Sequence, residues 1–506
     1  MGPDPAVEIE RKFDVDDDAA VPLLQDLPGI GRVAQPVEYQ LEAQYFDTED
    51  FRLAARHITV RRRTGGEDAG WHLKIPVGPD ERHEHHAPLG RKGDGVPASL
   101  LDLVRVHIRD RALVPVARLS TRRIVHHLHG EEGGILADLM DDRVRAEVLH
   151  PAQDSLHWRE WEIELVDGSR DLLDAAQTRV TEAGARPATH SSKLERTLGP
   201  LLRTVTDARP APTPDGPAAD VLLAYLHEQL TTLEQQDPQV RRDAPDAVHR
   251  MRVATRRARS ALATYRSLLE DADAVRSLRE ELKWLAGVLG KARDAEVMHA
   301  RLREMLAGEP ADLVLGPVGR RVDLELGGDY RKAHAQALKA LRGKRYFRLV
   351  DTFESLLAAP ALTARAAEPA ARVIPRLLNR DMRRLRSAVH EARHHPAWLG
   401  DHPALHQARK DAKRLRYGAE AAAPVGRKKI TRIADSALGI QKILGEHQDS
   451  VVTRDLLRRL GAAASLQGEN GFTYGRLHAL EQVVALRAEA RFRKEWKYFP
   501  TALGTK

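Results

Sequence analysis

The chain shows two different patterns of hydrophobic and polar positions. Up to about residue 200, short segments alternate between polar and apolar residues and are separated by turn signals such as Gly65-Gly66. A period of two with frequent turns predicts antiparallel strands, with residues 170–186 as an exception that predicts a helix. Beyond residue 218, Ala, Leu, Arg and Glu dominate at helical spacing, as in DVLLAYLHEQLTTLEQQ. We therefore expect a two-domain α+β protein whose second half is all-α.

A proline-rich segment separates the two patterns. Residues 208–217 read ARPAPTPDGP, which can continue neither a helix nor a sheet and fits a semi-rigid connection. A chain of 506 residues is also too long for one core. We expect a first domain at 1–205, a linker at 206–218 and a second domain at 219–506.

Composition excludes several kinds of site and segment. Cysteine is absent, which excludes disulfides, thiolate metal sites and a cysteine nucleophile. The N-terminus is charged where a signal peptide would be apolar, and no run of about 18 apolar residues occurs. A cytoplasmic protein without a membrane span is expected. The net charge of +7 is modest, but Arg runs in the second half indicate local anion sites.

The first predicted strand carries charge on one face. In VEIERKF, Glu8, Glu10 and Lys12 share one side of an extended chain, while Ile9 and Phe13 share the other. Two carboxylates and an ammonium are unsuited to a dry core. They suit a wet tunnel in which carboxylate oxygens hold a divalent cation.

Further predicted strands repeat this arrangement with both signs of charge. The charged positions are Arg61, Arg63, Lys74, Arg82, Glu84, Arg123, Glu160, Glu162 and Glu164. One such face alone would be the solvated side of a sheet. Several of them predict a closed or nearly closed sheet with a charged lumen, where carboxylates bind metal and Arg and Lys bind phosphate.

The motifs resemble those of a known family. VEIERK resembles the ExExK signature of the CYTH, or triphosphate tunnel metalloenzyme, family. The order of YFDT, VRRRT, WHLK, WREWEIEL and SSKLER resembles the rest of its layout over residues 6–200. The resemblance implies an eight-stranded antiparallel β-barrel with flanking helices. It also implies that this barrel binds a linear triphosphate together with Mg²⁺ or Mn²⁺.

The resemblance also implies residue roles. The catalytic residues would be Glu8, Glu10 and Lys12. The metal would be held by Glu8, Glu10, Asp138, Glu160, Glu162 and Glu164, with Asp141 and Asp142 competing for the place of Asp138. The phosphates would be held by Lys12, Arg61, Arg63, Lys74, Arg82, Arg123 and Lys193, with Arg122 competing with Arg123. Cations on both sides of the phosphates would favour attack by water, so no side-chain nucleophile is needed.

The second half repeats a motif. The segment HRMRVATRRAR from His249 aligns without gaps with HQARKDAKRLR from His406, and LGKARD ending at Asp294 aligns with LGEHQD ending at Asp449. The two His-to-Asp intervals are 45 and 43 residues. A duplicated helical bundle is predicted. Because Gly can end a helix and Asp can begin one, the structural alternative to a functional role for Asp294 and Asp449 is that of helix N-caps.

Each His-led segment places its cations on one narrow helical stripe at about 100° per residue. Such a stripe favours a polyanion, since few acidic neighbours relieve its repulsion. These features resemble the CHAD domain over residues 219–506, which implies polyphosphate binding. The binding residues would be His249, Arg252, Arg256, Arg257, Arg259, His406, Arg409, Lys413, Arg414 and Arg416.

The leading hypothesis is metal-dependent hydrolysis of inorganic triphosphate or short polyphosphate, with polyphosphate bound by the helical half. Alternatives are turnover of nucleoside or thiamine triphosphate, cyclisation of ATP by an adenylyl cyclase, or a non-catalytic polyphosphate-binding scaffold. Nucleic acid is a less favoured partner because only 5% of residues are aromatic and none interleaves with the Arg stripes. The sequence does not predict the oligomeric state.

Overall fold

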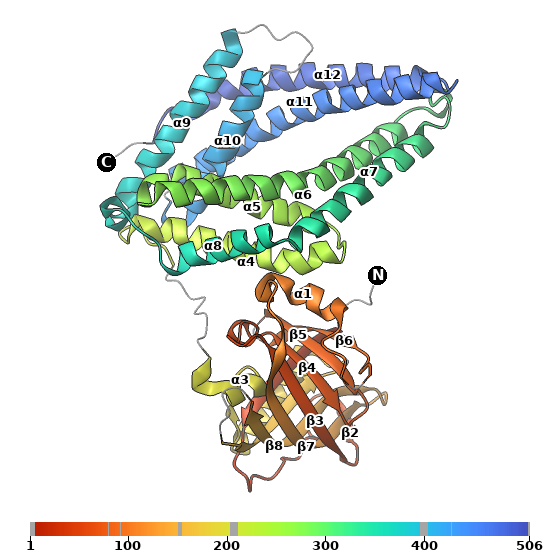
Figure 1. The fold of residues 1–506 in the computed structure, drawn as a ribbon, viewed down its shortest axis with the longest axis vertical. Coiled ribbons are helices and arrows are strands. Elements are labelled where there is room, and N and C mark those ends of the chain that lie inside the picture. Colours follow the sequence, from red (N-terminus) through yellow and green to blue (C-terminus); the bar gives the residue numbers. More distant parts are fainter. Residues whose placement is uncertain are drawn as a thin grey trace. The chain divides into compact units, whose positions relative to one another are not determined.

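The computed structural model describes residues 6–78, 80–91, 93–149, 154–202, 211–394, 403–426 and 428–503 (Figure 1). The chain forms two compact units, Met1–Asp207 and Ala208–Lys506. Residues 203–210, which include the first three residues of the proline-rich segment, lie outside the described residues. Within them, no helix combines the length and apolar character that crossing a bilayer requires.

The first unit is built mainly from strands. They are β1 Ala6–Asp14, β2 Ile30–Val33, β3 Val37–Asp47, β4 Thr59–Thr64, β5 Gly70–Gly78, β6 Glu81–Ala87, β7 Val114–Gly130, β8 Ile135–Val148, β9 Leu156–Leu165 and β10 Arg186–Pro187. Its α-helices are α1 Ala98–Ile108, α2 Arg170–Glu182 and α3 Lys193–Leu198.

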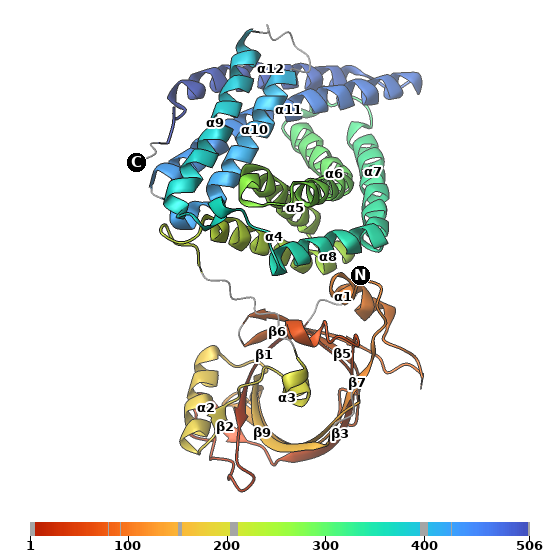
Figure 2. The same cartoon turned by 60° about the vertical axis from the view of Figure 1, so that its left-hand side comes forward.

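Eight of these strands close into a barrel. Their order is β1-β6-β5-β4-β3-β7-β8-β9, and β9 pairs back with β1. The pairings within this ring are antiparallel, while the short strands β2 and β10 add to β7 and β1. Figure 2 shows the ring of strands. The predicted eight-stranded antiparallel barrel is confirmed.

The barrel is charged on its inside and apolar on those parts of its outside that helices cover. Helix α2 covers Phe13, Trp161 and Ile163, which are almost fully buried. Helix α1 covers Trp71 and Leu73 in the same way. Successive side chains of a strand point to opposite faces. When these apolar residues are buried under helices, the charged residues between them therefore point into the lumen.

Helix α3 fills one end of the lumen. Its Leu194 and Leu198 pack against the inward-facing Leu119, Val144 and Trp158 of β7, β8 and β9. Figure 2 shows α3 at the barrel opening. The apolar plug leaves the charged part of the lumen as a cavity and delivers the first residue of α3, Lys193, into it.

The helix predicted over 170–186 is shorter than expected. It ends at Glu182, and the chain turns through Gly184, whose φ of +95° lies in the left-handed region. Such a residue ends the regular helix. The remaining residues Arg186–Pro187 join the sheet as β10 instead.

The second unit is helical, as predicted. Its α-helices are α4 Ala218–Arg241, α5 Ala247–Thr264, α6 Ala272–Ala307, α7 Val318–Leu341, α8 Lys344–Ala358, α9 Ala370–His394, α10 Pro403–Ala421, α11 Lys428–Leu466 and α12 Phe472–Glu495. Helices α4–α7 and α9–α12 form two similar runs. Pro217 and Pro369, which precede α4 and α9, pair in an isolated antiparallel bridge, as expected for a duplication about a local two-fold axis.

The alternative that Asp294 and Asp449 are helix N-caps is wrong. Both residues lie inside uninterrupted helices, α6 and α11. The preceding glycines have a different role, because a Cβ on Gly290 would come within 3.4 Å of the Arg252 guanidinium. The glycine makes room for this arginine to lie across α6 and reach Asp294.

Candidate functional site

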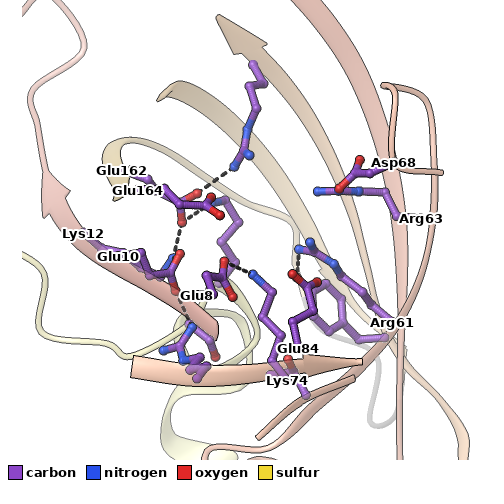
Figure 3. Close-up of a pocket in the computed structure, with 16 residues that line it drawn as sticks. Glu8, Glu10, Lys12, Arg61, Arg63, Asp68, Lys74, Glu84, Glu162 and Glu164 are labelled. Atoms are coloured by element: carbon purple, nitrogen blue, oxygen red, sulfur yellow. Dashed lines mark hydrogen bonds and ion pairs between the residues drawn. The ribbon is translucent and has the colours of Figure 1, made fainter. Parts of the chain in front are cut away.

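The lumen holds a charged cavity of about 90 Å³ (Figure 3). Of the predicted tunnel residues, it is lined by Glu8, Glu10, Lys12, Arg61, Arg63, Lys74, Arg82, Glu84, Arg123, Glu162, Glu164 and Lys193. These side chains come from strands far apart in the sequence and from α3. Closure of the barrel therefore brings together residues that the sequence only placed on separate strand faces.

Strand β1 sits at the centre of an ion-pair network. Lys12 contacts Glu10 at 2.7 Å and also contacts Glu162, while Lys74 contacts Glu8 and Arg82 contacts Glu10. Burial alone would raise the pKa of Glu10, but Lys12, Lys74 and Arg82 lower it to about 2. Glu10 is therefore ionised throughout the physiological pH range.

Two carboxylates in the cavity are poorly compensated. Burial, together with the charges of Glu8 and Glu10, raises the pKa of Glu164 to about 7. Burial also raises the pKa of Glu8 despite its contact with Lys74, and its Oε2 is buried without a hydrogen bond among the described residues. Glu10 and Glu164 face each other across β1 and β9. This side of the cavity therefore carries negative charge that a further cation could neutralise.

A second acidic group lies deeper in the barrel. Carboxylate oxygens of Asp142, Glu160 and Glu162 lie within 4.8 Å of one another. The Lys193 ammonium contacts them at 2.8, 2.6 and 2.8 Å, and Arg123 contacts Asp142 at 2.6 Å. The three carboxylates could hold a metal ion, but the Lys193 ammonium already lies among them.

Asp138 lies elsewhere than expected. It is on the inward face of β8 opposite Glu164, but its carboxylate contacts His127 Nδ1 at 2.7 Å and does not line the cavity. Its competitor Asp142 joins the acidic group instead. Of the two competing arginines, Arg123 lines the cavity; Arg122 is exposed and pairs with Glu38.

Some cavity residues were not assigned a role from the sequence. Asp68, in the turn between β4 and β5, pairs with Arg63; a turn residue has no alternation to reveal it. Tyr45 lies opposite Arg61 in the sheet, and its hydroxyl contacts the Arg61 guanidinium at 3.4 Å. Burial and the neighbouring Arg61 and Arg123 lower the pKa of Arg63 to about 9, so this end of the cavity favours an anion.

A capping box fixes the start of α3. Ser192 Oγ accepts a hydrogen bond from the Glu195 amide, and Glu195 Oε2 accepts one from the Ser191 amide at 2.9 Å. The two bonds satisfy backbone donors that the helix itself leaves unpaired. His57 Nδ1 lies 3.0 Å from Ser191 Oγ. This arrangement holds Lys193 with its side chain in the acidic group.

The second unit brings four of its predicted cations together. Arg252 and Arg256 on α5 lie beside Arg409 and Lys413 on α10. Among the described residues, Arg256 and Lys413 have no ion-pair partner. Burial, together with Arg256, Arg409 and Arg252, lowers the pKa of Lys413 to about 6. These four residues, named here the basic cluster, repel one another in the absence of an anion.

Among the described residues, acidic side chains pair with the basic cluster at its two ends, from corresponding positions of the repeat. Arg252 donates to Asp294 at 3.1 Å, and Arg409 lies 3.9 Å from Asp449. The duplicated motif therefore produces two similar half-sites that meet where α5 packs on α10.

The other predicted cations of the second unit have different surroundings. Arg257 and Arg416 both pair with Glu420, at 3.5 and 2.6 Å. Arg414 donates to Asp381 on α9 at 3.1 Å. Burial and nearby Arg279 lower the pKa of Arg259.

The two histidines that begin the repeated segments are half-buried. His406 contacts Gln448 at 2.9 Å. Burial and nearby Arg293 lower the pKa of His249.

Comparisons with known proteins match each half of the chain to the family that its motifs resemble. Residues 6–197 match the CYTH domain and residues 224–458 match the CHAD domain. A protein of Mycobacterium tuberculosis (strain CDC 1551 / Oshkosh), named Uncharacterized protein MT2285, is 42% identical over 516 residues, covering 96% of each chain.

Two solved structures are similar in part. The CHAD domain from the plant Ricinus communis is 24% identical, with a TM-score of 0.47, covering 58% of this chain and 96% of that one. HpAC1 from Hippeastrum, described as having a dominant triphosphatase activity, is 17% identical, with a TM-score of 0.24, covering 38% and 98%. The full-length match and the two domain matches lead to one conclusion: the chain belongs to the proteins in which a CYTH domain is followed by a CHAD domain.

Proposed function

We propose that the barrel hydrolyses inorganic triphosphate or a short polyphosphate with the help of Mg²⁺ or Mn²⁺. The observation that carries the proposal is the cavity in which Glu8, Glu10 and Lys12 converge with arginines and lysines from the opposite strands. A row of phosphates needs cations along its length, and a divalent ion needs carboxylate oxygens. This cavity offers both within one enclosed space.

The residues present fit a hard divalent cation. Glu8, Glu10 and Glu164 supply oxygen ligands, which Mg²⁺ and Mn²⁺ prefer. The unpartnered Glu8 Oε2 and the raised pKa of Glu164, to about 7, mark them as carboxylates in need of positive charge. When bound, such an ion would neutralise phosphate oxygens and lower the pKa of a coordinated water.

The remaining residues of the cavity have binding and positioning roles in this proposal. Arg61 and Arg63 would hold phosphate oxygens at one end of the chain, and Lys12, Lys74 and Arg82 along its middle. Fixed cations stabilise the charge that spreads over the equatorial oxygens during transfer to water. The barrel wall and the α3 plug keep bulk solvent out and so strengthen these interactions.

The full chain tests the barrel assignment. We expect phosphate release from inorganic triphosphate with Mg²⁺ or Mn²⁺, and a loss of at least about 100-fold in the double variant Glu8→Gln, Glu10→Gln. Glu38→Gln with Glu42→Gln is the matched control, because these residues lie on the exposed face of β3. A panel of ATP and thiamine triphosphate, with cyclic AMP measured separately, identifies the substrate. Undiminished turnover in the tunnel variant would refute the assignment.

For the second unit we infer binding of polyphosphate at the basic cluster. Its support is the absence of ion-pair partners for Arg256 and Lys413 among the described residues, and the depressed pKa of Lys413. Arg256→Gln with Lys413→Gln should weaken polyphosphate binding and reduce its salt dependence. Arg320→Gln with Arg331→Gln, on the exposed side of α7, should leave both unchanged. Equal weakening by the two pairs would place binding elsewhere.

A further inference from the structure

The duplication allows the two halves of the second unit to be compared position by position. Helices α4 and α9 correspond from Ala218 and Ala370, so Tyr225 corresponds to Leu377 and Glu228 to Arg380. Helices α5 and α10 correspond from the two histidines that begin the repeated motifs. By this register, Arg257 corresponds to Arg414 and Glu420 to Ala263.

In one half, a closed network fills the space between these helices. Arg414 donates to Asp381 at 3.1 Å and to the Ala263 carbonyl oxygen at 2.7 Å. Arg380 donates to the Thr264 carbonyl oxygen at 2.6 Å. Two guanidinium groups thus pair with the Asp381 carboxylate and with the last carbonyls of α5, although Asp381 Oδ1 has an ion pair and no hydrogen bond among the described residues.

In the other half, the equivalent space is hollow. Glu420 Oε1 accepts a hydrogen bond from Arg416 at 2.6 Å, but Arg257 reaches Glu420 Oε2 only as an ion pair at 3.5 Å. Glu228 stands where the other half has a cation. The result is a cavity of about 350 Å³ between α4, α5 and α10, a volume within the range of small-molecule sites. Its apolar walls are Pro212, Val221, Ala224, Ala421, Ala423 and Pro424.

Three buried polar atoms in residues that line this cavity have no hydrogen bond among the described residues. They are the Tyr225 hydroxyl, Glu420 Oε2 and Arg257 Nε. Tyr225 is 8% exposed, so its hydroxyl cannot turn to bulk solvent. Buried polar groups are costly unless they are paired, and three of them around one hollow indicate a space built for a polar occupant.

We propose that this cavity binds a small aliphatic cation, namely a compound with a guanidinium or primary ammonium group on a short methylene chain. The cationic group takes the position that the Arg380 guanidinium occupies in the other half, between Glu228 and Glu420. The methylenes lie against the alanine and proline walls, and the Tyr225 hydroxyl completes the polar contacts. This site is separate from the tunnel and from the basic cluster, and it rests on neither proposed activity.

Isothermal titration of the full chain with agmatine tests the proposal in the absence of polyphosphate. Glu420→Gln should raise the Kd at least about tenfold, since it removes a buried charge partner, and Glu280→Gln on the exposed face of α6 should not. Ala224→Leu fills the cavity and keeps every polar group, so it should also abolish binding. The Glu8→Gln, Glu10→Gln chain should bind normally, which excludes the tunnel as the site.

A neutral compound with the same four-carbon chain, but with a urea in place of the guanidinium and no terminal amine, supplies the chemical control. Butylurea should bind at least about tenfold more weakly than agmatine, because it lacks the charge that Glu420 recognises. No heat with agmatine would mean that water alone fills the cavity and would overturn the proposal. Equal binding by the Ala224→Leu chain, or equal binding of butylurea, would overturn it as well. If Glu420→Gln does not fold, Ala224→Leu decides.

Discussion

Replacing Lys193 by Met should destabilise the barrel in a way that depends on pH. In the intact protein its ammonium touches Asp142, Glu160 and Glu162. Arg123 still compensates the first and third of these after the substitution. Of the partners that the described residues offer, Glu160 keeps the Trp158 indole N–H at 2.5 Å and a distant Arg196 at 3.9 Å. The loss therefore falls mainly on one buried carboxylate.

The magnitude follows from the alternative open to that carboxylate, which is to take up a proton. For a carboxylate with the usual unfolded Glu pKa of about 4.3, taking up a proton at about pH 7.5 costs about 4 kcal/mol. That figure agrees with the roughly 3–5 kcal/mol expected when a buried ion pair loses one partner. At about pH 5 the same protonation costs only about 1 kcal/mol. The variant should therefore lose most stability near neutral pH and approach the wild type in acid.

The intact protein should show the opposite trend. Burial alone would raise the pKa of Glu162, but Lys12, Lys193 and Arg123 hold it well below its usual range. Its folded-state pKa lies below that of the unfolded chain. The stability that it contributes is therefore present above the unfolded pKa and is lost as the pH falls toward the folded one. Acid thus weakens the wild type while it relieves the variant.

Chemical denaturation at the two pH values, followed by tryptophan fluorescence, measures the difference in the free energy of unfolding. Lys283→Met is the control, because its ion pair with Glu280 at 3.2 Å is exposed and should contribute less than about 1 kcal/mol. Added Mg²⁺ should stabilise the Lys193→Met chain more than the wild type, since the acidic group is then open to a divalent ion. A difference that is absent, or equal at both pH values, would refute the reasoning.

Three further predictions concern the basic cluster. Lys413→Met should raise the free energy of unfolding by roughly 1–3 kcal/mol near pH 7. The native pKa of about 6 lies below the usual 10.5, so the charged Lys413 lowers the stability of the wild type most below pH 6. The stability gained by the substitution should vanish at alkaline pH, where the lysine is neutral in both the folded and the unfolded chain. Polyphosphate binding should take up a proton at Lys413, so its affinity should rise as the pH falls from about 8 to 6; a flat pH profile would contradict this. Asp294→Asn and Asp449→Asn should each strengthen polyphosphate binding a few-fold at fixed salt by removing a like charge; weakening would show that the arginines depend on these carboxylates for their position.

Much of the tunnel was predictable because alternation in a strand is a local property. Once Phe13 and Trp161 are assigned to the apolar outside, Glu10 and Glu162 must face inward. The depth at which a side chain lies along the lumen is not a local property, because it depends on the pairing between strands. Asp138 and Asp142 lie on the same face of β8, and only the register with β9 decides which one meets Glu160.

The helical half shows the same limit in another form. The spacing of 100° per residue correctly placed Arg256 and Lys413 on one stripe of each repeat. It did not predict that Arg414, one residue along, reaches Asp381 on α9. The Leu-Gly pairs did not reveal that their glycines serve packing and do not end a helix. Gly290 is needed because the Arg252 side chain lies across it, a contact that the sequence does not show.

The two cationic sites differ in how their charge is balanced, and the difference has a consequence for binding. In the tunnel, Lys74 is held by Glu8, Arg82 by Glu10 and Lys193 by the acidic group. A phosphate chain that binds there must replace carboxylates as the partner of each cation, and the released carboxylates then need positive charge of their own. Triphosphate and a divalent ion should therefore each strengthen the binding of the other by the same factor.

Within the described part of the chain, carboxylates balance the basic cluster at its ends and pair with neither Arg256 nor Lys413. A polyanion that binds between α5 and α10 displaces no carboxylate from Arg256 or Lys413, so its affinity should not require a divalent ion. Divalent ions should even weaken it by screening the polyanion. One titration series with and without Mg²⁺ thus separates the two sites in the intact chain: triphosphate binding that needs the ion belongs to the tunnel, and polyphosphate binding that does not need it belongs to the helices.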